Sequence, residues 1–153
     1  MVALSLEFPV STPFPPPATT VLVVDDQHFA RRVAYRVLSE VGYRVLEAED
    51  GEEALEALYA PRASVDLVMI DVVMPKMDGV ELAARIWERW PEKRILFTSG
   101  HAAEVLAQHG LVYLDVPFLA KPYTRDEALA KVREALERRQ ADRADNPARP
   151  RPS

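Results

Sequence analysis

Cysteine is absent from the 153 residues, which excludes a disulfide framework, a zinc–thiolate centre and thiol catalysis. The chain also lacks any apolar run near the roughly 18 to 20 residues that span a bilayer. Its start has no basic segment and carries Glu7 within its only apolar stretch, so it does not resemble a secretory signal. We therefore expect a soluble, cytoplasmic protein that does not associate with a membrane.

Basic residues are in the minority, 19 against 24 acidic ones, and the formal net charge is −5 at pH 7. Their distribution is uneven: in residues 138–153 five arginines outnumber two aspartates, and prolines interrupt the segment. An acidic body argues against a nucleic-acid groove, and so short a tail does not form one. The composition predicts a protein that does not bind nucleic acid.

Proline density separates two terminal segments from one folded unit. Five prolines lie within residues 1–18, and proline removes backbone donors and favours extended conformations. A hydrophobic content of 48% suits one domain with a single core. We predict a disordered Pro-rich arm over residues 1–18, one domain over residues 19–139, and a disordered basic tail over residues 140–153.

Apolar segments of two kinds alternate within that domain. Runs typical of strands cover Val21–Val24, Arg44–Ala48, Val65–Ile70, Arg94–Thr98 and Phe118–Ala120. Helical spacing of apolar residues covers His28–Val41, Gly51–Tyr59, Val80–Arg89, Ala102–Gln108 and Thr124–Arg138. In the first of these helices the residues at helical spacing are Phe29, Val33, Val37, Leu38 and Val41. Such alternation predicts an α/β fold, a doubly wound five-stranded parallel sheet with helices on both faces.

Two neighbouring acids, Asp25 and Asp26, come directly after the first predicted strand. An apolar run such as Val21–Val24 is typical of a parallel strand that is buried on both faces. Two carboxylates at its end repel each other and lose hydration. Both effects cost free energy unless a cation lies between the carboxylates. The pair therefore predicts a metal site.

Reactive side chains also follow three other predicted strands. Ligands of an open parallel sheet bind beyond the carboxyl ends of its strands, where this chain has Asp71, Ser99 and Lys121. Each residue alone has an ordinary explanation as a turn or surface residue. Their joint occurrence at the strand ends indicates that three carboxylates, a hydroxyl and an ammonium converge on one functional rim.

Four motifs, VLVVDD, MIDVVMPKMDG, ILFTSG and LAKPY, occur in this order and at spacings that closely resemble the receiver domain of two-component response regulators. The resemblance covers about 120 of the 153 residues. It implies a flavodoxin-like sheet with strand order 2-1-3-4-5. It also implies that Asp71 accepts a phosphoryl group from a phosphohistidine of a histidine kinase or of a histidine phosphotransfer protein.

The resemblance also implies a Mg²⁺ cofactor and roles for the remaining site residues. The expected ligands of Mg²⁺ are Asp25, Asp26, Asp71 and the backbone carbonyl of Val73. Lys121 would neutralise charge on the transferred oxygens, and a cis bond to Pro122 would aim its ammonium into the site.

Transmission of the signal is expected to involve Ser99 and Phe118. In receivers the hydroxyl after the fourth strand moves to the phosphoryl group and an aromatic on the fifth strand turns inward, which makes a two-state switch. An ordinary core aromatic at Phe118 stays open as an alternative. The pair Gly100-His101 resembles receivers that are fused to hybrid histidine kinases.

The function that we expect is that of a phosphoacceptor switch, which is not an enzyme beyond its own phosphorylation and slow dephosphorylation. It would act on an unidentified downstream protein, without a DNA-binding output domain, as a monomer or weak homodimer. A Mg²⁺-dependent phosphatase with an aspartyl phosphate is disfavoured, because its second acid would stand where the chain has Val73. A flavin-binding protein is disfavoured because the first loop has acids instead of a phosphate cradle.

Overall fold

The computed structural model describes residues 19–60, 64–101 and 116–138. Its strands are β1 (Thr20–Val24), β2 (Arg44–Ala48), β3 (Leu67–Asp71), β4 (Arg94–Ser99) and β5 (Phe118–Ala120). Its helices are α1 (His28–Glu40), α2 (Gly51–Tyr59), α3 (Gly79–Arg89) and α5 (Arg125–Glu137). The predicted arm over residues 1–18, the tail over residues 140–153 and the helix Ala102–Gln108 lie outside the described residues.

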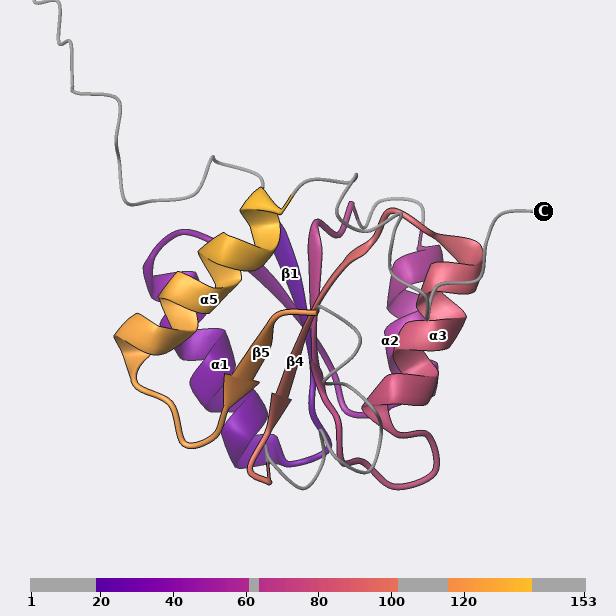
Figure 1. Ribbon diagram of the computed structural model, residues 1–153, viewed down its shortest axis with the longest axis horizontal. Coiled ribbons are helices and arrows are strands. Elements are labelled where there is room, and N and C mark those ends of the chain that lie inside the picture. Colours follow the sequence, from indigo (N-terminus) through magenta and orange to yellow (C-terminus); the bar gives the residue numbers. More distant parts are fainter. Residues whose placement is uncertain (1–18, 61–63, 102–115, 139–153) are drawn as a thin grey trace, which may run out of the picture.

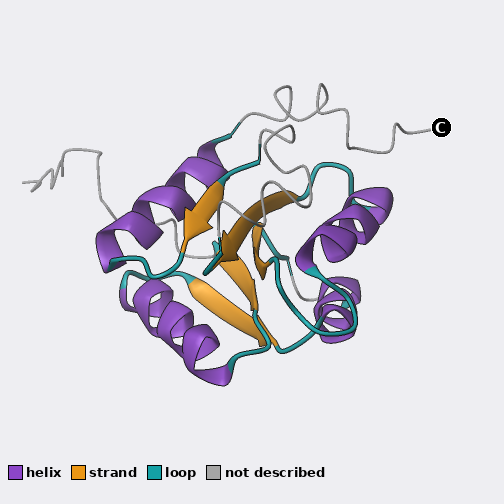
Figure 2. Ribbon diagram, turned by 60° about the horizontal axis from the view of Figure 1, so that its bottom comes forward, coloured by secondary structure: helices purple, strands orange, loops and turns teal. Residues whose placement is uncertain are grey.

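The five strands form one parallel sheet in the order β2-β1-β3-β4-β5, which confirms the predicted fold and strand order. Helices α1 and α5 cover one face of the sheet, and α2 and α3 cover the other (Figure 1). All strands point the same way, so their carboxyl ends meet at a single edge (Figure 2). Candidate site residues that are far apart in the sequence come together at that edge.

The core consists of two apolar layers that the central strands separate. Along β1, Leu22 and Val24 pack toward α2 and α3, whereas Val21 and Val23 pack toward α1 and α5. This alternation follows from the period of two in a strand, and it explains why the whole run is apolar. The strand that carries the first acids is therefore held on both faces.

Three helices begin at a side-chain cap. Asp50, Asp78 and Thr124 each accept a hydrogen bond from the backbone N–H three residues on, at 2.8 to 3.1 Å. Such caps satisfy a donor that the first helical turn leaves free. Asp78 thereby helps to begin α3 directly after the loop that leaves β3. None of the described helices has the length and apolar character of a membrane span.

Two expectations from the sequence need correction. Of the predicted face, Leu38 and Val41 are buried, but Phe29 and Val33 are 83% and 37% exposed, because α1 turns a stripe with Ala34 and Leu38 toward the sheet. Both stripes have helical spacing, so periodicity alone does not choose between them. In addition, β3 begins at Leu67, two residues after the predicted start.

Candidate phosphoacceptor and metal site

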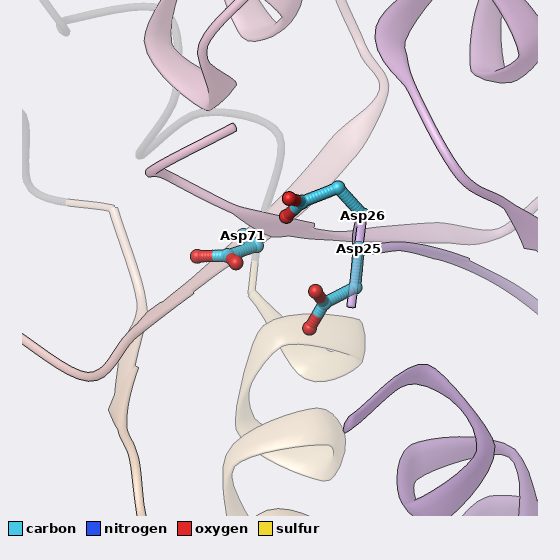
Figure 3. Close-up of side chains that lie close together, drawn as sticks. All are labelled: Asp25, Asp26 and Asp71. Carbon is cyan, nitrogen blue, oxygen red and sulfur yellow. The ribbon is translucent and has the colours of Figure 1, made fainter. Parts of the chain in front are cut away.

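Three carboxylates meet at the carboxyl edge of the sheet. Asp25 and Asp26 follow β1, Asp71 ends β3, and each contributes an oxygen to a group that lies within 4.8 Å (Figure 3). Asp25 and Asp71 are buried at 4% and 6% exposure, whereas Asp26 is exposed. The exposed acid leaves this group open to solvent on one side.

Lys121, directly after β5, brings a cation to the two buried acids. Its Nζ lies 2.7 Å from Oδ2 of Asp25 and 3.5 Å from Oδ2 of Asp71. Burial by itself lowers the pKa of this ammonium, but the hydrogen bond to Asp25 and the charge of Asp71 outweigh it and raise the pKa. The Lys121–Pro122 peptide bond is cis, as expected from the sequence. Lys121 therefore stays charged beside the acids.

Asp71 lies in an electrostatic environment that disfavours its charged form. Burial raises the pKa of its carboxyl to about 6, the Lys121 charge opposes this shift, and the Asp25 charge adds to it. The backbone N–H of Val73 donates a hydrogen bond to Oδ1 of Asp71 at 3.3 Å. Even with Lys121 present, the protein alone does not fully compensate the charge of Asp71.

The donor set fits a hard divalent cation. Carboxylate oxygens are the ligands that Mg²⁺ prefers, and it usually retains several waters beside one or two carboxylates. The exposed Asp26 provides access to solvent water. The raised pKa of Asp71 is the sign of a carboxylate that gains from a nearby cation.

The loop after β3 depends on Gly79, whose part in the site the sequence analysis missed. Its N–H donates to the carbonyl of Val72 at 2.8 Å. A Cβ at this position would lie 2.5 Å from the backbone oxygen of Asp71 and 2.8 Å from the Cα of Val72. Only glycine permits so close an approach of α3 to the chain beside Asp71. The adjacent Asp78-Gly79 pair was the available sequence signal.

Ser99 and Phe118 lie at the ends of the neighbouring strands. The Ser99 hydroxyl is buried and accepts a hydrogen bond from the N–H of His101 at 3.1 Å. Its carbonyl accepts from the N–H of Lys121 at 2.9 Å, which ties β4 to the lysine. Phe118 is half-buried and packs against the core layer under α2 and α3. Ser99 is thus connected to the acidic edge, whereas Phe118 begins β5 and pairs with Phe97 of β4.

The fold and this arrangement at the sheet edge define a class of signalling domain, and the comparisons agree. Residues 21–133 match the response regulator receiver domain family, so this chain belongs to that family. Receivers generally bind Mg²⁺ at an acidic pocket and interact with histidine kinases and phosphotransfer proteins.

Among curated proteins, the chain is similar to the response regulator receiver protein CpdR of Brucella abortus. The two are 33% identical over 116 residues, which are 76% of this chain and 95% of CpdR. The sensor kinase CckA of the same organism is 36% identical over 121 residues, 79% of this chain but 13% of CckA. The chemotaxis protein CheY4 of Vibrio cholerae superposes with a TM-score of 0.68 at 28% identity, covering 78% of this chain and 99% of CheY4.

Proposed function

We propose that this receiver accepts a phosphoryl group on Asp71 from a phosphohistidine of a histidine kinase or phosphotransfer protein, in a Mg²⁺-dependent reaction. The observation that carries the proposal is the buried Asp71 carboxylate, grouped with Asp25 and Asp26 and 3.5 Å from the Lys121 ammonium. A buried acid whose pKa is raised beside a fixed cation is a frequent feature of functional sites.

In the proposed step, a carboxylate oxygen of Asp71 forms a bond to phosphorus while the bond between phosphorus and the histidine nitrogen breaks. The electron pair of that bond leaves with the imidazole. Mg²⁺, held by Asp25, Asp26, Asp71 and the backbone carbonyl of Val73, would supply positive charge to the transferred oxygens. Lys121 lies where its ammonium adds a second positive charge, and such positioned charges account for most of phosphoryl-transfer catalysis.

The partner surface that we propose begins at the exposed apolar residues of α1. Phe29 and Val33 line a groove of about 420 Å³ that continues to Lys121 and Pro122. Apolar side chains exposed beside a reactive site are typical of a protein docking surface. A phosphodonor that packs an apolar helix here would present its phosphohistidine close to the site residue Lys121.

After phosphorylation, we propose that the Ser99 hydroxyl turns to the phosphoryl group and that Phe118 packs further inward. The hydroxyl accepts a hydrogen bond from His101 N–H, and its own O–H would donate to a phosphoryl oxygen. Phe118 is only partly buried on the short strand β5, so further burial is open to it. The readout would be contact with a downstream protein, and the acidic net charge of −5 disfavours DNA as the target.

Intact mass spectrometry after incubation with Mg²⁺ and acetyl phosphate tests this proposal. We expect a gain of one phosphoryl group, its loss in Asp71→Asn, and no labelling when a chelator removes Mg²⁺. Asp66→Asn is the matched control, because Asp66 lies at the opposite end of β3 and binds Thr20 N–H instead. Labelling that persists in Asp71→Asn contradicts the assignment of the phosphoacceptor.

A further inference from the structure

Arg31 of α1 connects the first acidic pair to the neighbouring strand β2. Its Nη1 donates a hydrogen bond to the backbone oxygen of Asp25 at 2.8 Å, and its Nε lies 3.3 Å from Oε1 of Glu47. Its Nη2 lies 3.2 Å from Nδ1 of His28. The Arg31 side chain is only 12% exposed, so its contacts with Asp25 and Glu47 are largely shielded from water. All three guanidinium nitrogens therefore have a partner.

Both ends of Asp25 are anchored to the same part of β2. Its N–H donates to the oxygen of Ala48 at 3.1 Å, and its carbonyl reaches Glu47 through Arg31. In the described part of the chain Oε1 of Glu47 is buried and has no hydrogen-bond partner, so the ion pair with Arg31 is its compensation. The ion pair with Glu47 thus fixes the Arg31 side chain, which in turn binds the backbone oxygen of Asp25.

The carbonyl that Arg31 binds belongs to the peptide unit that leads to Asp26. A peptide unit is planar, so fixing the Asp25 oxygen also fixes the direction in which the chain enters Asp26. Within the described residues the Asp26 carboxylate accepts no hydrogen bond, and it is exposed. Its place beside Asp25 and Asp71 therefore depends on its backbone.

We propose that Arg31, supported by Glu47, is a positioning residue of the metal site, which keeps the Asp25 and Asp26 carboxylates at a spacing that suits a divalent cation. This inference rests on the proposed function, because it concerns the Mg²⁺ site on which phosphorylation of Asp71 depends. Groups that orient metal ligands typically change metal affinity 10- to 100-fold when they are replaced.

The neighbouring Arg32 provides a matched control. It pairs with the other oxygen of Glu47 at 2.6 Å and lies over the ring of Tyr35, and its side chain is 48% exposed. It has the same charge and the same acidic partner as Arg31 but makes none of the contacts with Asp25. The two arginines therefore differ in the hydrogen bond to the backbone oxygen of Asp25, on which the proposal depends.

Charge alone predicts an effect of the opposite sign. Arg31 is a positive charge near acids that would bind Mg²⁺, so its removal should strengthen Mg²⁺ binding if only Coulomb repulsion mattered. Loss of positioning should weaken binding instead. The direction of the change therefore separates the two explanations.

Calorimetric titration of Mg²⁺ into the full chain is the deciding experiment. We expect Arg31→Met to bind Mg²⁺ roughly 10-fold more weakly than the wild type. Arg32→Met should stay within about twofold, because its charge is exposed and screened. Arg31→Lys keeps the charge, but one ammonium does not reproduce the guanidinium fork, so binding should again be weaker.

Labelling by acetyl phosphate is the second readout. Saturating Mg²⁺ should restore the labelling rate of Arg31→Met, because the proposed defect lies in holding the metal. If circular dichroism shows that Arg31→Met is unfolded, the Mg²⁺ affinities of Arg31→Lys and Glu47→Gln decide the question. Equal Mg²⁺ affinity in Arg31→Met and Arg32→Met, or tighter binding in Arg31→Met, overturns the inference. A wild-type chain that binds Mg²⁺ but is not labelled on Asp71 overturns the proposed function instead.

Discussion

At the amino edge of the sheet, Asp66 and Lys93 each meet a backbone group, whereas the charges of the carboxyl edge meet one another. Asp66 accepts from the N–H of Thr20 at 2.8 Å, and Lys93 donates to the carbonyl of Val65 at 2.9 Å. These bonds close the ends of adjacent strands. Here the ionisable side chains complete the hydrogen bonding of the fold.

At the carboxyl edge, two buried carboxylates share one lysine, and an exposed carboxylate lies beside them. The pKa of Asp71 is raised to about 6, so its charged form is unfavourable in the metal-free fold. A bound cation or a covalent phosphoryl group changes that balance. Ionisable side chains therefore complete backbone hydrogen bonds at the amino edge. At the carboxyl edge the unfavourable charge of Asp71 favours binding of a cation.

Removal of the shared cation should produce the largest difference between the edges. In Lys121→Met the transferred oxygens lose their second positive charge, so labelling by acetyl phosphate with Mg²⁺ should slow by roughly 100- to 1000-fold. The metal-free fold should lose about 3 kcal/mol, as when one member of a buried ion pair is deleted. Intact mass and urea unfolding measure the two effects. A labelling rate equal to that of the wild type would show that Lys121 has no part in the transfer.

The next effect is a dependence of stability on pH. The pKa of Asp71 is about 6 in the fold against 3.8 for a free carboxyl, so the native state binds the proton more tightly. Its contribution is therefore stabilising below about pH 4 and is lost as the pH rises through 6, by on the order of 3 kcal/mol. Asp71→Asn should remove this loss and be more stable than the metal-free wild type at pH 8.

Urea unfolding of both proteins from pH 4 to pH 8 checks that prediction. The difference between them should grow with pH, since a protonated aspartate resembles asparagine. Mg²⁺ should narrow the difference at pH 8 by stabilising only the wild type. An Asp71→Asn chain that is less stable than the wild type at pH 8 without metal would show that the Lys121 charge fully compensates Asp71.

The sequence was informative wherever position along a strand determined the outcome. Asp25, Asp71 and Lys121 could be placed at one edge because parallel strands end together. Leu38 and Val41 of the predicted α1 face are buried, but Phe29 and Val33 are exposed, since α1 has two apolar stripes and only packing selects one.

Contacts between segments that are far apart in the sequence are not marked by any sequence pattern. The bond from Arg31 to the carbonyl of Asp25 joins a helix side chain to a strand end, and no periodicity marks it. The part of Gly79 follows from the absence of a Cβ beside Asp71, which becomes visible only when the two segments are placed together. Strand ends could thus be predicted, but the residues that support them could not.

Glycine substitutions offer a smaller test of the carboxyl edge. In Gly79→Ala the new Cβ would meet backbone atoms beside Asp71, so we expect a loss of about 1 to 3 kcal/mol and slower labelling. Gly100→Ala is the matched control, because a Cβ there meets nothing within 4 Å. Urea unfolding should place it within about 0.5 kcal/mol of the wild type. Equal stability of the two variants would mean that the loop after β3 relaxes freely.

The smallest effect should come from the lysine of the amino edge. Burial lowers the pKa of Lys93, so keeping its ammonium charged in the fold costs free energy. Lys93→Met keeps most of the aliphatic stem and loses the hydrogen bond to the carbonyl of Val65. It also removes the free-energy cost of burying the charge. We expect a net change within about 1 kcal/mol and unchanged labelling of Asp71. If Lys93→Met slows labelling as Lys121→Met does, the two edges are coupled through the sheet, and the division between a structural and a functional edge fails.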